Sequence, residues 1–303
     1  MATSPPASPP RPFLKWAGGK GRLIEQYLPY FPSRFHTYYE PFLGGGAIFF
    51  HLFPTMKSAV LTDLNPELVN VYRCVRDQVE TVLERLKEHQ QYHSKEYFYQ
   101  VRENPSADPV ERAARLIYLN KTCYNGLYRE NSKGKFNVPI GRYKNPKIYN
   151  PELLRSVCTA LQIAQIEVTP FEAIADLPKD SQDFVYFDPP YYPISDTSNF
   201  TAYNRYAFGS EDQTRLQQTF AKLARRSIPV MLSNSDCPFI RNLYQDFPTH
   251  TIQAARNINS NARRRGKITE LLITSYPAPL KCLPALESNP PDHPAPDSRQ
   301  YPG

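Results

Sequence analysis

The chain has 303 residues, of which 41% are hydrophobic and 21% charged, an ordinary composition for a globular protein. Its formal charge of +7 suggests a polyanionic partner. No apolar run reaches the length of a transmembrane helix, and the proline-rich N-terminus does not resemble a secretory signal. The five cysteines are widely spaced and form no CxxC, which argues against a disulfide framework and a zinc knuckle. We therefore expect a cytoplasmic protein with reduced thiols, no bound metal and no membrane anchor.

Proline and hydrophobic periodicity divide the chain. Residues 1–12 and 277–303 hold 13 of the 31 prolines and lack apolar periodicity, so we expect disordered tails there. Strand patterns occur at 36–42, 58–62, 166–169, 184–187, 230–233 and 271–276, with helical patterns at 47–53 and 211–226. From 66 to 120 the pattern is helical, amphipathic at 66–90 and 109–120, and 128–143 resembles a hairpin that turns at 132–134. The sequence therefore predicts an α/β core interrupted by a mostly helical insertion at about 70–150.

A glycine-rich turn follows the first predicted strand. The string Glu40-Pro41-Phe42-Leu43-Gly44-Gly45-Gly46 lets a ligand approach the backbone beside a helix N-terminus. It is neither GxGxxG nor a phosphate-binding GxxxxGK[ST] loop, and a tight structural turn is equally compatible with it. Asp63 ends the second predicted strand, where an acid can accept from both hydroxyls of a ribose. A helix N-cap is the alternative role for Asp63. Together the two features favour a nucleoside-containing cofactor.

The most informative motif is Asp188-Pro189-Pro190-Tyr191, which follows the apolar run 184–187 at the carboxyl end of a predicted strand. Ligands bind at this edge of open α/β sheets, although a plain strand-end turn is the alternative. The Asp188 carboxylate and a proline carbonyl can accept from both hydrogens of an aromatic amine such as that of adenine, which concentrates the nitrogen lone pair. Tyr191 offers a face on which the base can stack. A sulfonium methyl donor is already electrophilic and needs mainly to be positioned.

Four blocks in this order resemble the Dam family of DNA adenine-N6 methyltransferases, which use S-adenosylmethionine. They are Phe13-Leu14-Lys15-Trp16-Ala17-Gly18-Gly19-Lys20, the glycine string at 40–46, Thr62-Asp63-Leu64-Asn65 and Asp188-Pro189-Pro190-Tyr191. The resemblance covers 13–276. It implies a Rossmann-like methyltransferase sheet with helices on both faces, formed by 13–69 and 151–276, and a target-recognition domain at 70–150.

The resemblance also implies roles for individual residues. Catalysis falls to Asp188, Pro189 and Tyr191. The implied cofactor-binding positions are Trp16, Ala17, Gly18, Lys20, Glu40, Phe42, Gly44, Gly46, Asp63, Phe171 and Asp188. Residues 256–263 and 270–276 resemble the family's C-terminal signature. The implied cofactor is S-adenosylmethionine.

Residues 120–129 and 136–142 resemble the recognition segment of family members that read GATC. The implied DNA-binding positions are Lys15, Tyr124, Asn125, Leu127, Arg129, Pro139 and Arg142. In those relatives the position of Arg129 reads a guanine, and those of Leu127 and Pro139 touch base methyls, as major-groove chemistry allows. The amine of adenine is paired inside the duplex, so the base must be flipped out. We expect the aromatic loop after Tyr191, at 192–208, to be mobile and to close over the flipped base.

Positive charge is concentrated in two segments. Residues 115–147 carry a net charge of +7 and residues 256–267 a charge of +5, which leaves −5 for the remainder of the chain. We predict that both segments line a cleft for double-stranded DNA. We further expect a monomer that associates with the nucleoid.

Other chemistries receive less support from the sequence. His89 and His93 have the i, i+4 spacing of a metal pair, but no third ligand is evident, so we expect a surface pair. Ser233 and Ser235 lack a His–Asp arrangement for nucleophilic catalysis. Two alternatives stay open: an adenine-N6 methyltransferase of another DNA or RNA target, and a catalytically silent DNA-binding relative. A cytosine-N4 enzyme more often has Ser in place of Asp188, and a protein glutamine methyltransferase has Asn.

Overall fold

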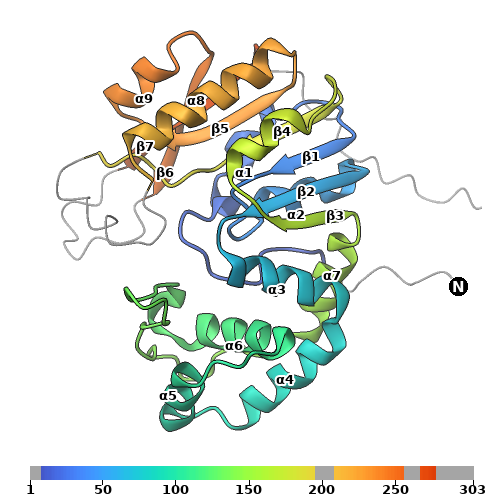
Figure 1. Ribbon diagram of the computed structural model, residues 1–303, viewed down its shortest axis with the longest axis vertical. Coiled ribbons are helices and arrows are strands. Elements are labelled where there is room, and N and C mark those ends of the chain that lie inside the picture. Colours follow the sequence, from blue (N-terminus) through green and yellow to red (C-terminus); the bar gives the residue numbers. More distant parts are fainter. Residues whose placement is uncertain (1–7, 195–207, 256–266, 278–303) are drawn as a thin grey trace, which may run out of the picture.

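The computed structural model describes residues 8–194, 208–255 and 267–277. Within these residues, a sheet of seven strands has the order β3-β2-β1-β4-β5-β7-β6 (Figure 1). The strands are β1 (Thr37–Glu40), β2 (Ser58–Asp63), β3 (Ala164–Val168), β4 (Asp183–Phe187), β5 (Val230–Ser235), β6 (Thr249–Ala255) and β7 (Lys267–Thr274). Neighbouring strands from β3 to β5 are parallel, whereas β7 runs antiparallel to both β5 and β6. The order reverses between β1 and β4, so the carboxyl ends of these strands flank the crevice where such sheets bind ligands.

Helices cover both faces of the sheet, which confirms the predicted fold class. Every residue of β4 is buried; Phe184 and Tyr186 join the core on one face, Val185 and Phe187 the core on the other. Helices α3 and α7 lie on one side and α8 and α9 on the other (Figure 1). The helices of this α/β part are α1 (Ile24–Tyr27), α2 (Ala47–Leu52), α3 (Pro66–Asp77), α7 (Pro151–Leu161), α8 (Ser210–Arg225) and α9 (Pro238–Leu243).

Three further helices form a layer beyond α3: α4 (Val79–Gln91), α5 (Lys95–Glu103) and α6 (Pro109–Thr122). Helix α3 contacts β2 and β3 on one side and α6 on the other, so it joins the sheet to this layer (Figure 1). The expected boundary at 69/70 therefore falls inside one continuous helix. The stretch 66–90, expected as a single helical pattern, is two helices because the backbone of Gln78 leaves the helical region at φ −141° and ψ 40°.

Two elements differ from the sequence-based prediction. In the described structure the segment 128–143 reverses direction around Gly134 but has only isolated bridges, Glu130 with Phe136 and Cys123 with Ile140. Its tip is rich in Asn, Ser, Gly and Lys, which are poor strand formers, so no regular ladder develops. Strand β6 was not predicted. It is an edge strand, and its polar residues around the buried Ile252 give a weak strand signal.

Several predictions concern residues outside the described ranges. The aromatic loop at 192–208 is described only at its two ends, and the basic residues at 256–266 and most of both expected tails are not described. Those predictions stay as they were made.

Candidate active site and DNA interface

Asp188 follows β4 at the carboxyl edge of the sheet, where two side chains hold its Oδ1 oxygen. Lys20 Nζ forms an ion pair with Oδ1 at 2.8 Å, and the Ser233 hydroxyl on β5 donates to the same oxygen at 2.8 Å. The Lys20 side chain is 4% exposed and the Asp188 side chain 19%. Because both contacts use Oδ1, Oδ2 has no partner among the described residues and can accept from a ligand.

Tyr191 lies beside the same ion pair. Its hydroxyl donates to Glu270 Oε2 on β7 at 2.7 Å, and Lys20 Nζ lies 4.6 Å from the centroid of its ring. Burial raises the pKa of Tyr191 well above its ordinary value, and the negative charge of Asp188 adds to the effect. Tyr191 is therefore a neutral phenol whose ring is held from two directions, one of them by a cation–π contact.

The two prolines of the motif are not equivalent. The carbonyl of Pro190 accepts from the side-chain amide of Gln213 on α8 at 3.0 Å. The carbonyl of Pro189 has no donor within the described part of the chain. The two proline carbonyls, which look alike in the sequence, thus differ in the described structure: that of Pro190 is hydrogen-bonded to Gln213, and that of Pro189 is not bonded to any described residue.

The glycine turn after β1 is tied to Asp63 at the end of β2. Asp63 accepts from the backbone N–H of Gly44 through Oδ2 at 3.1 Å and from that of Asn65 through Oδ1 at 2.9 Å. Gly44 and Gly46 have φ of +48° and +64°, the left-handed region in which glycine is favoured. Asn65, rather than Asp63, caps α3, since its side chain accepts from the N–H groups of Glu67 and Leu68. The N-cap alternative for Asp63 is therefore wrong.

Aromatic rings gather beside the glycine turn. The rings of Phe42 and Phe171 stack at 5.5 Å between centroids, and Phe208 packs edge-on against both. This cluster offers an apolar wall for a flat ring. Glu40, in contrast, is buried and accepts from the hydroxyl of Tyr38 at 3.0 Å. The contact of Glu40 with Tyr38 therefore lies inside the protein. Burial also raises the pKa of Glu40 well above its ordinary value.

Trp16 connects the glycine turn with the 123–143 segment. Its ring stacks on Tyr128 at 5.3 Å, and a Cβ atom at Gly44 would lie only 2.9 Å from Trp16 Cδ1. Ala17 and Gly18 beside it are exposed. Trp16 thus contacts a glycine of the turn directly, and any side chain at Gly44 would displace it.

The residues expected to touch DNA share one property, which is exposure. All seven lie on the surface: Lys15, Tyr124, Asn125, Leu127, Arg129, Pro139 and Arg142. Tyr124 is 53% and Leu127 39% exposed, unusual for large apolar side chains. Asn125 has a φ of +55°, a conformation that Asn tolerates better than most residues. Arg129 donates through Nε to Asn137 Oδ1 at 2.7 Å.

Asn120 on α6 joins this surface to the N-terminal block. Its buried side chain accepts from the N–H of Lys15 at 2.8 Å and donates to the carbonyls of Lys15 and Gly126 at 2.7 and 3.0 Å. Lys15 Nζ in turn donates to the hydroxyl of Tyr143 at 3.0 Å. The structure therefore brings Lys15 together with the 123–143 segment, although more than a hundred residues separate them.

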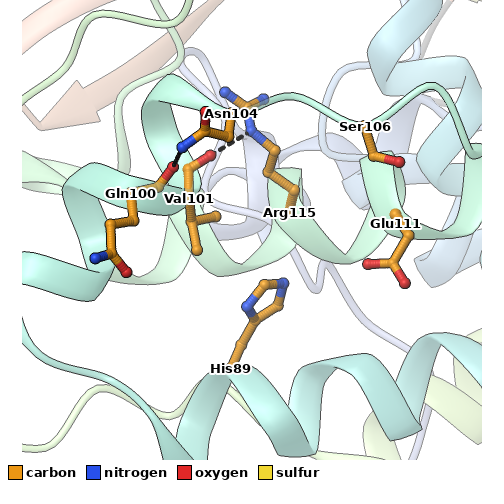
Figure 2. A pocket seen from close by; sticks show the side chains of 7 residues that line it. All are labelled: His89, Gln100, Val101, Asn104, Ser106, Glu111 and Arg115. Carbon is orange, nitrogen blue, oxygen red and sulfur yellow. Dashed lines mark hydrogen bonds between the residues drawn. The ribbon is translucent and has the colours of Figure 1, made fainter.

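Two expectations for the helical layer need correction (Figure 2). His89 is not on the surface: it is buried, and its Nδ1 lies 2.8 Å from the hydroxyl of Tyr97. Arg115 was counted with the DNA-facing charges, but it donates to the carbonyls of Val101 and Arg102 at 2.7 and 2.6 Å. With other residues they line a cavity of about 270 Å³. His89 on α4 and Arg115 on α6 are held between helices because both make their contacts with residues of α5.

The structure also contains functional contacts that the sequence did not reveal. Ser233, Gln213 and Glu270 each hold one part of the Asp188 motif. A signal was present in β5, which changes from Val230-Met231-Leu232 to Ser233-Asn234-Ser235 at its carboxyl end. In the described residues no group of three or more His, Cys, Asp or Glu side chains could hold a metal. None of the described helices is long and apolar enough to cross a membrane.

A doubly wound sheet with a glycine turn after β1, an acid ending β2 and Asp-Pro-Pro-Tyr after β4 defines a class of protein, the methyltransferases of amino groups. The chain belongs to the family of D12 class N6 adenine-specific DNA methyltransferases, whose family model matches residues 16–258. It is therefore an enzyme that methylates adenine in DNA, as the sequence motifs predicted.

Relatives cover nearly the same length. A type II methyltransferase of Lactococcus lactis subsp. cremoris is 45% identical over 274 residues, which span 88% of this chain and 95% of that protein. A type II methyltransferase of Methanocaldococcus jannaschii is 41% identical over 287 residues (88% and 99%). The DNA adenine methylase of Escherichia coli K12 is 37% identical over 273 residues (88% and 96%).

Proposed function

We propose that this enzyme transfers a methyl group from S-adenosylmethionine to the N6 amine of an adenine that has been flipped out of double-stranded DNA, and that GATC is the sequence it reads. The observation that carries the proposal is the pair of acceptors at the end of β4 that have no partner among the described residues, Asp188 Oδ2 and the Pro189 carbonyl. The amine of adenine has two hydrogens to donate, which matches two adjacent acceptors.

The residues around the glycine turn fit the cofactor. Gly44 and Gly46 give a backbone turn without side chains, Asp63 offers carboxylate oxygens for ribose hydroxyls, and Phe42 and Phe171 offer a wall for an adenine ring. S-adenosylmethionine, when bound, supplies an electrophilic methyl group on sulfur. The glycine turn and Asp188 lie at the ends of the adjacent strands β1 and β4, so a cofactor and a target base held there would be neighbours.

In this mechanism the protein positions groups and manages the amine protons. Lys20 and Ser233 fix Asp188 through Oδ1, which leaves Oδ2 to accept one N–H of the amine. The Pro189 carbonyl accepts the other. With both hydrogens engaged, the lone pair of the nitrogen is directed to the methyl group instead of the ring. As the nitrogen forms its bond to the methyl group, the bond from sulfur to that methyl breaks and the sulfur keeps its electron pair. The nitrogen then carries one proton too many and would lose it through its hydrogen bond to Asp188 Oδ2. Tyr191, held by Glu270 and Lys20, provides the ring on which the base stacks.

The support for GATC comes from the exposed residues of the 123–143 segment. Arg129 uses only Nε in its bond to Asn137, and its two terminal nitrogens have no partner among the described residues. That end of the guanidinium can bind the O6 and N7 atoms of guanine together. Leu127 and Pro139 are exposed apolar groups that suit thymine methyls. Tyr124 is the most exposed of the large hydrophobic side chains of the segment and suits insertion into the base stack.

A labelling experiment tests this proposal. The purified protein is incubated with cofactor carrying a labelled methyl group and with two duplexes, one containing GATC and one in which GTTC replaces it. We expect labelled N6-methyladenine only in the first duplex, and 2-aminopurine at the target position should brighten when the base is flipped. Equal labelling of both duplexes would reject GATC as the target. Binding of the GATC duplex without any transfer would identify a silent DNA-binding relative.

A further inference from the structure

Three buried polar side chains enclose the backbone just after the catalytic motif. Gln213 Nε2 donates to the carbonyl of Pro190 at 3.0 Å, and Asn234 Nδ2 donates to Gln213 Oε1 at 2.9 Å. Asn234 Oδ1 accepts from the N–H of Tyr192 at 3.2 Å, and the Ser235 hydroxyl donates to the carbonyl of Tyr192 at 2.7 Å. We call Gln213, Asn234 and Ser235 the backbone clamp.

Gln213 occupies a position where an apolar side chain is usual. The buried face of α8 is formed by Gln213, Leu216, Thr219, Phe220 and Leu223, so Gln213 is the one large polar side chain on a face that the helical pattern makes mostly apolar. Gln213 and Asn234 are both 0% exposed. Burying an amide is unfavourable unless its groups are hydrogen-bonded, and pairs of apolar residues are often as stable as a bonded polar pair. Core stability alone therefore does not account for these residue types.

The clamp fixes the backbone on both sides of Tyr191, at Pro190 and at Tyr192. Gln213 holds the Pro190 carbonyl towards α8, while Asn234 and Ser235 hold both backbone groups of Tyr192 against β5. Between these anchors, Pro189 and Pro190 have a restricted φ. The Pro189 carbonyl, in contrast to that of Pro190, accepts from no donor among the described residues.

We propose that the backbone clamp is a positioning device for methyl transfer. By engaging the Pro190 carbonyl and the Tyr192 peptide groups, it presents the Pro189 carbonyl beside Asp188 as the second acceptor for the amine of adenine. This inference rests on the proposed function of Asp188 and Pro189. Gln213, Asn234 and Ser235 do not touch the substrate; they act through the backbone of the motif.

The test compares Gln213→Leu with Gln218→Leu. Both substitutions lie on α8, but Gln218 is exposed, so the second is a matched control. We expect Gln213→Leu to slow single-turnover methyl transfer at saturating cofactor and DNA by about 10- to 100-fold, because small misplacements of reacting groups have effects of that order. The dissociation constants for S-adenosylmethionine and GATC duplex should stay within about twofold of the parent, since the contacts to both ligands are unchanged. A normal transfer rate in Gln213→Leu would overturn the proposal.

Two further variants keep the test decisive. Ser235→Ala removes the bond to the Tyr192 carbonyl at 2.7 Å, together with the longer contacts of the hydroxyl to Asn234 Oδ1 at 3.5 Å and Cys237 Sγ at 3.8 Å, and it serves if Gln213→Leu does not fold. We expect it to slow transfer by about 3- to 10-fold, as for the loss of one strong hydrogen bond. An unchanged rate in Ser235→Ala would count against the clamp.

Asp188→Asn separates the two proposals. If Asp188→Asn is inactive while the clamp variants transfer normally, the clamp is wrong and the proposed function stands. If Asp188→Asn transfers normally, the role of Asp188 on which the clamp depends is wrong, whereas absence of transfer by the parent protein would reject the proposed function itself.

Discussion

The carboxyl edge of the sheet and the 123–143 segment differ in how their polar groups are satisfied. At the edge, Asp188, Tyr191 and the backbone of Pro190 are each held by side chains from other elements, most of them buried. In the 123–143 segment, Arg129 and Tyr143 make exposed contacts, the latter with Lys15, and three large hydrophobic side chains are exposed. The polar groups of the first region are fixed by contacts within the protein, an arrangement that would suit the proposed catalysis. The second offers unpaired groups, as a surface does that is completed by its partner.

We expect the largest effect when the charge of Asp188, the acid at the carboxyl edge of the sheet, is removed. Asp188→Asn keeps the shape of the side chain but removes its charge, and we expect methyl transfer to fall by about 10²- to 10⁴-fold, the range found for essential catalytic groups. Binding of GATC duplex should be retained, because the 123–143 segment does not contact Asp188. The measurement is single-turnover transfer together with fluorescence anisotropy of labelled duplex.

Asp236→Asn is a matched control for Asp188→Asn. Asp236 directly follows β5 and pairs with Arg241 at 2.7 Å, so it is also an acid at the end of a strand with a basic partner. This variant should transfer methyl groups at the parental rate. If Asp188→Asn instead fails to fold while Asp236→Asn folds normally, Asp188 is a structural partner of Lys20 rather than a catalytic acid.

The sequence predicted the edge well because each motif there is local. A strand pattern followed by Gly44, by Asp63 or by Asp188 places these residues at carboxyl ends of parallel strands, and the sheet brings those ends together. It did not predict that Ser233 would hold Asp188, since 45 positions separate them and only the pairing of β4 with β5 makes them neighbours. The same holds for Gln213, whose amide looks like any polar residue on a helix until the packing of α8 is known.

The 123–143 segment was harder to predict from its sequence. Its turn at Gly134 was found, but paired strands were expected and only isolated bridges formed. The difference arises because this segment is stabilised by single contacts to distant residues, such as Tyr143 with Lys15, instead of by a repeating ladder. Periodicity in a sequence reports regular structure, and this region has little of it.

The second prediction concerns the helical layer that supports the 123–143 segment. Burial lowers the pKa of His89 from its ordinary value of 6.5 to about 4, with Arg115 and Arg85 adding to the effect and Glu88 opposing it. Between these pH values the unfolded chain binds a proton that the folded chain does not. The free energy of unfolding should therefore fall as the pH falls from 6.5 towards 4, by up to about 3 kcal/mol from this residue.

Urea unfolding at several pH values measures this contribution. His89→Gln should show a smaller loss of stability on acidification than the parent, because the titrating group is gone. His36→Gln is the control, since His36 is exposed, and it should keep the parental pH dependence. Identical slopes for His89→Gln and the parent would show that the ring of His89 is not held neutral by the helical layer.

We expect the smallest effect from a change in the 123–143 segment, at Arg129. Arg129→Ala should reduce discrimination between GATC and duplexes with a changed guanine by about 1–3 kcal/mol, since a bidentate contact to one base is lost. Transfer at saturating GATC duplex should change little, because the edge of the sheet is untouched.

Lys133→Ala, at the exposed tip of the same segment, is the control. If Lys133 binds a phosphate, its loss weakens all duplexes alike and lowers the slope of the salt dependence by about one. Uniform weakening by Arg129→Ala as well would mean that Arg129 binds backbone phosphate, and the reading of guanine would then have to come from another residue.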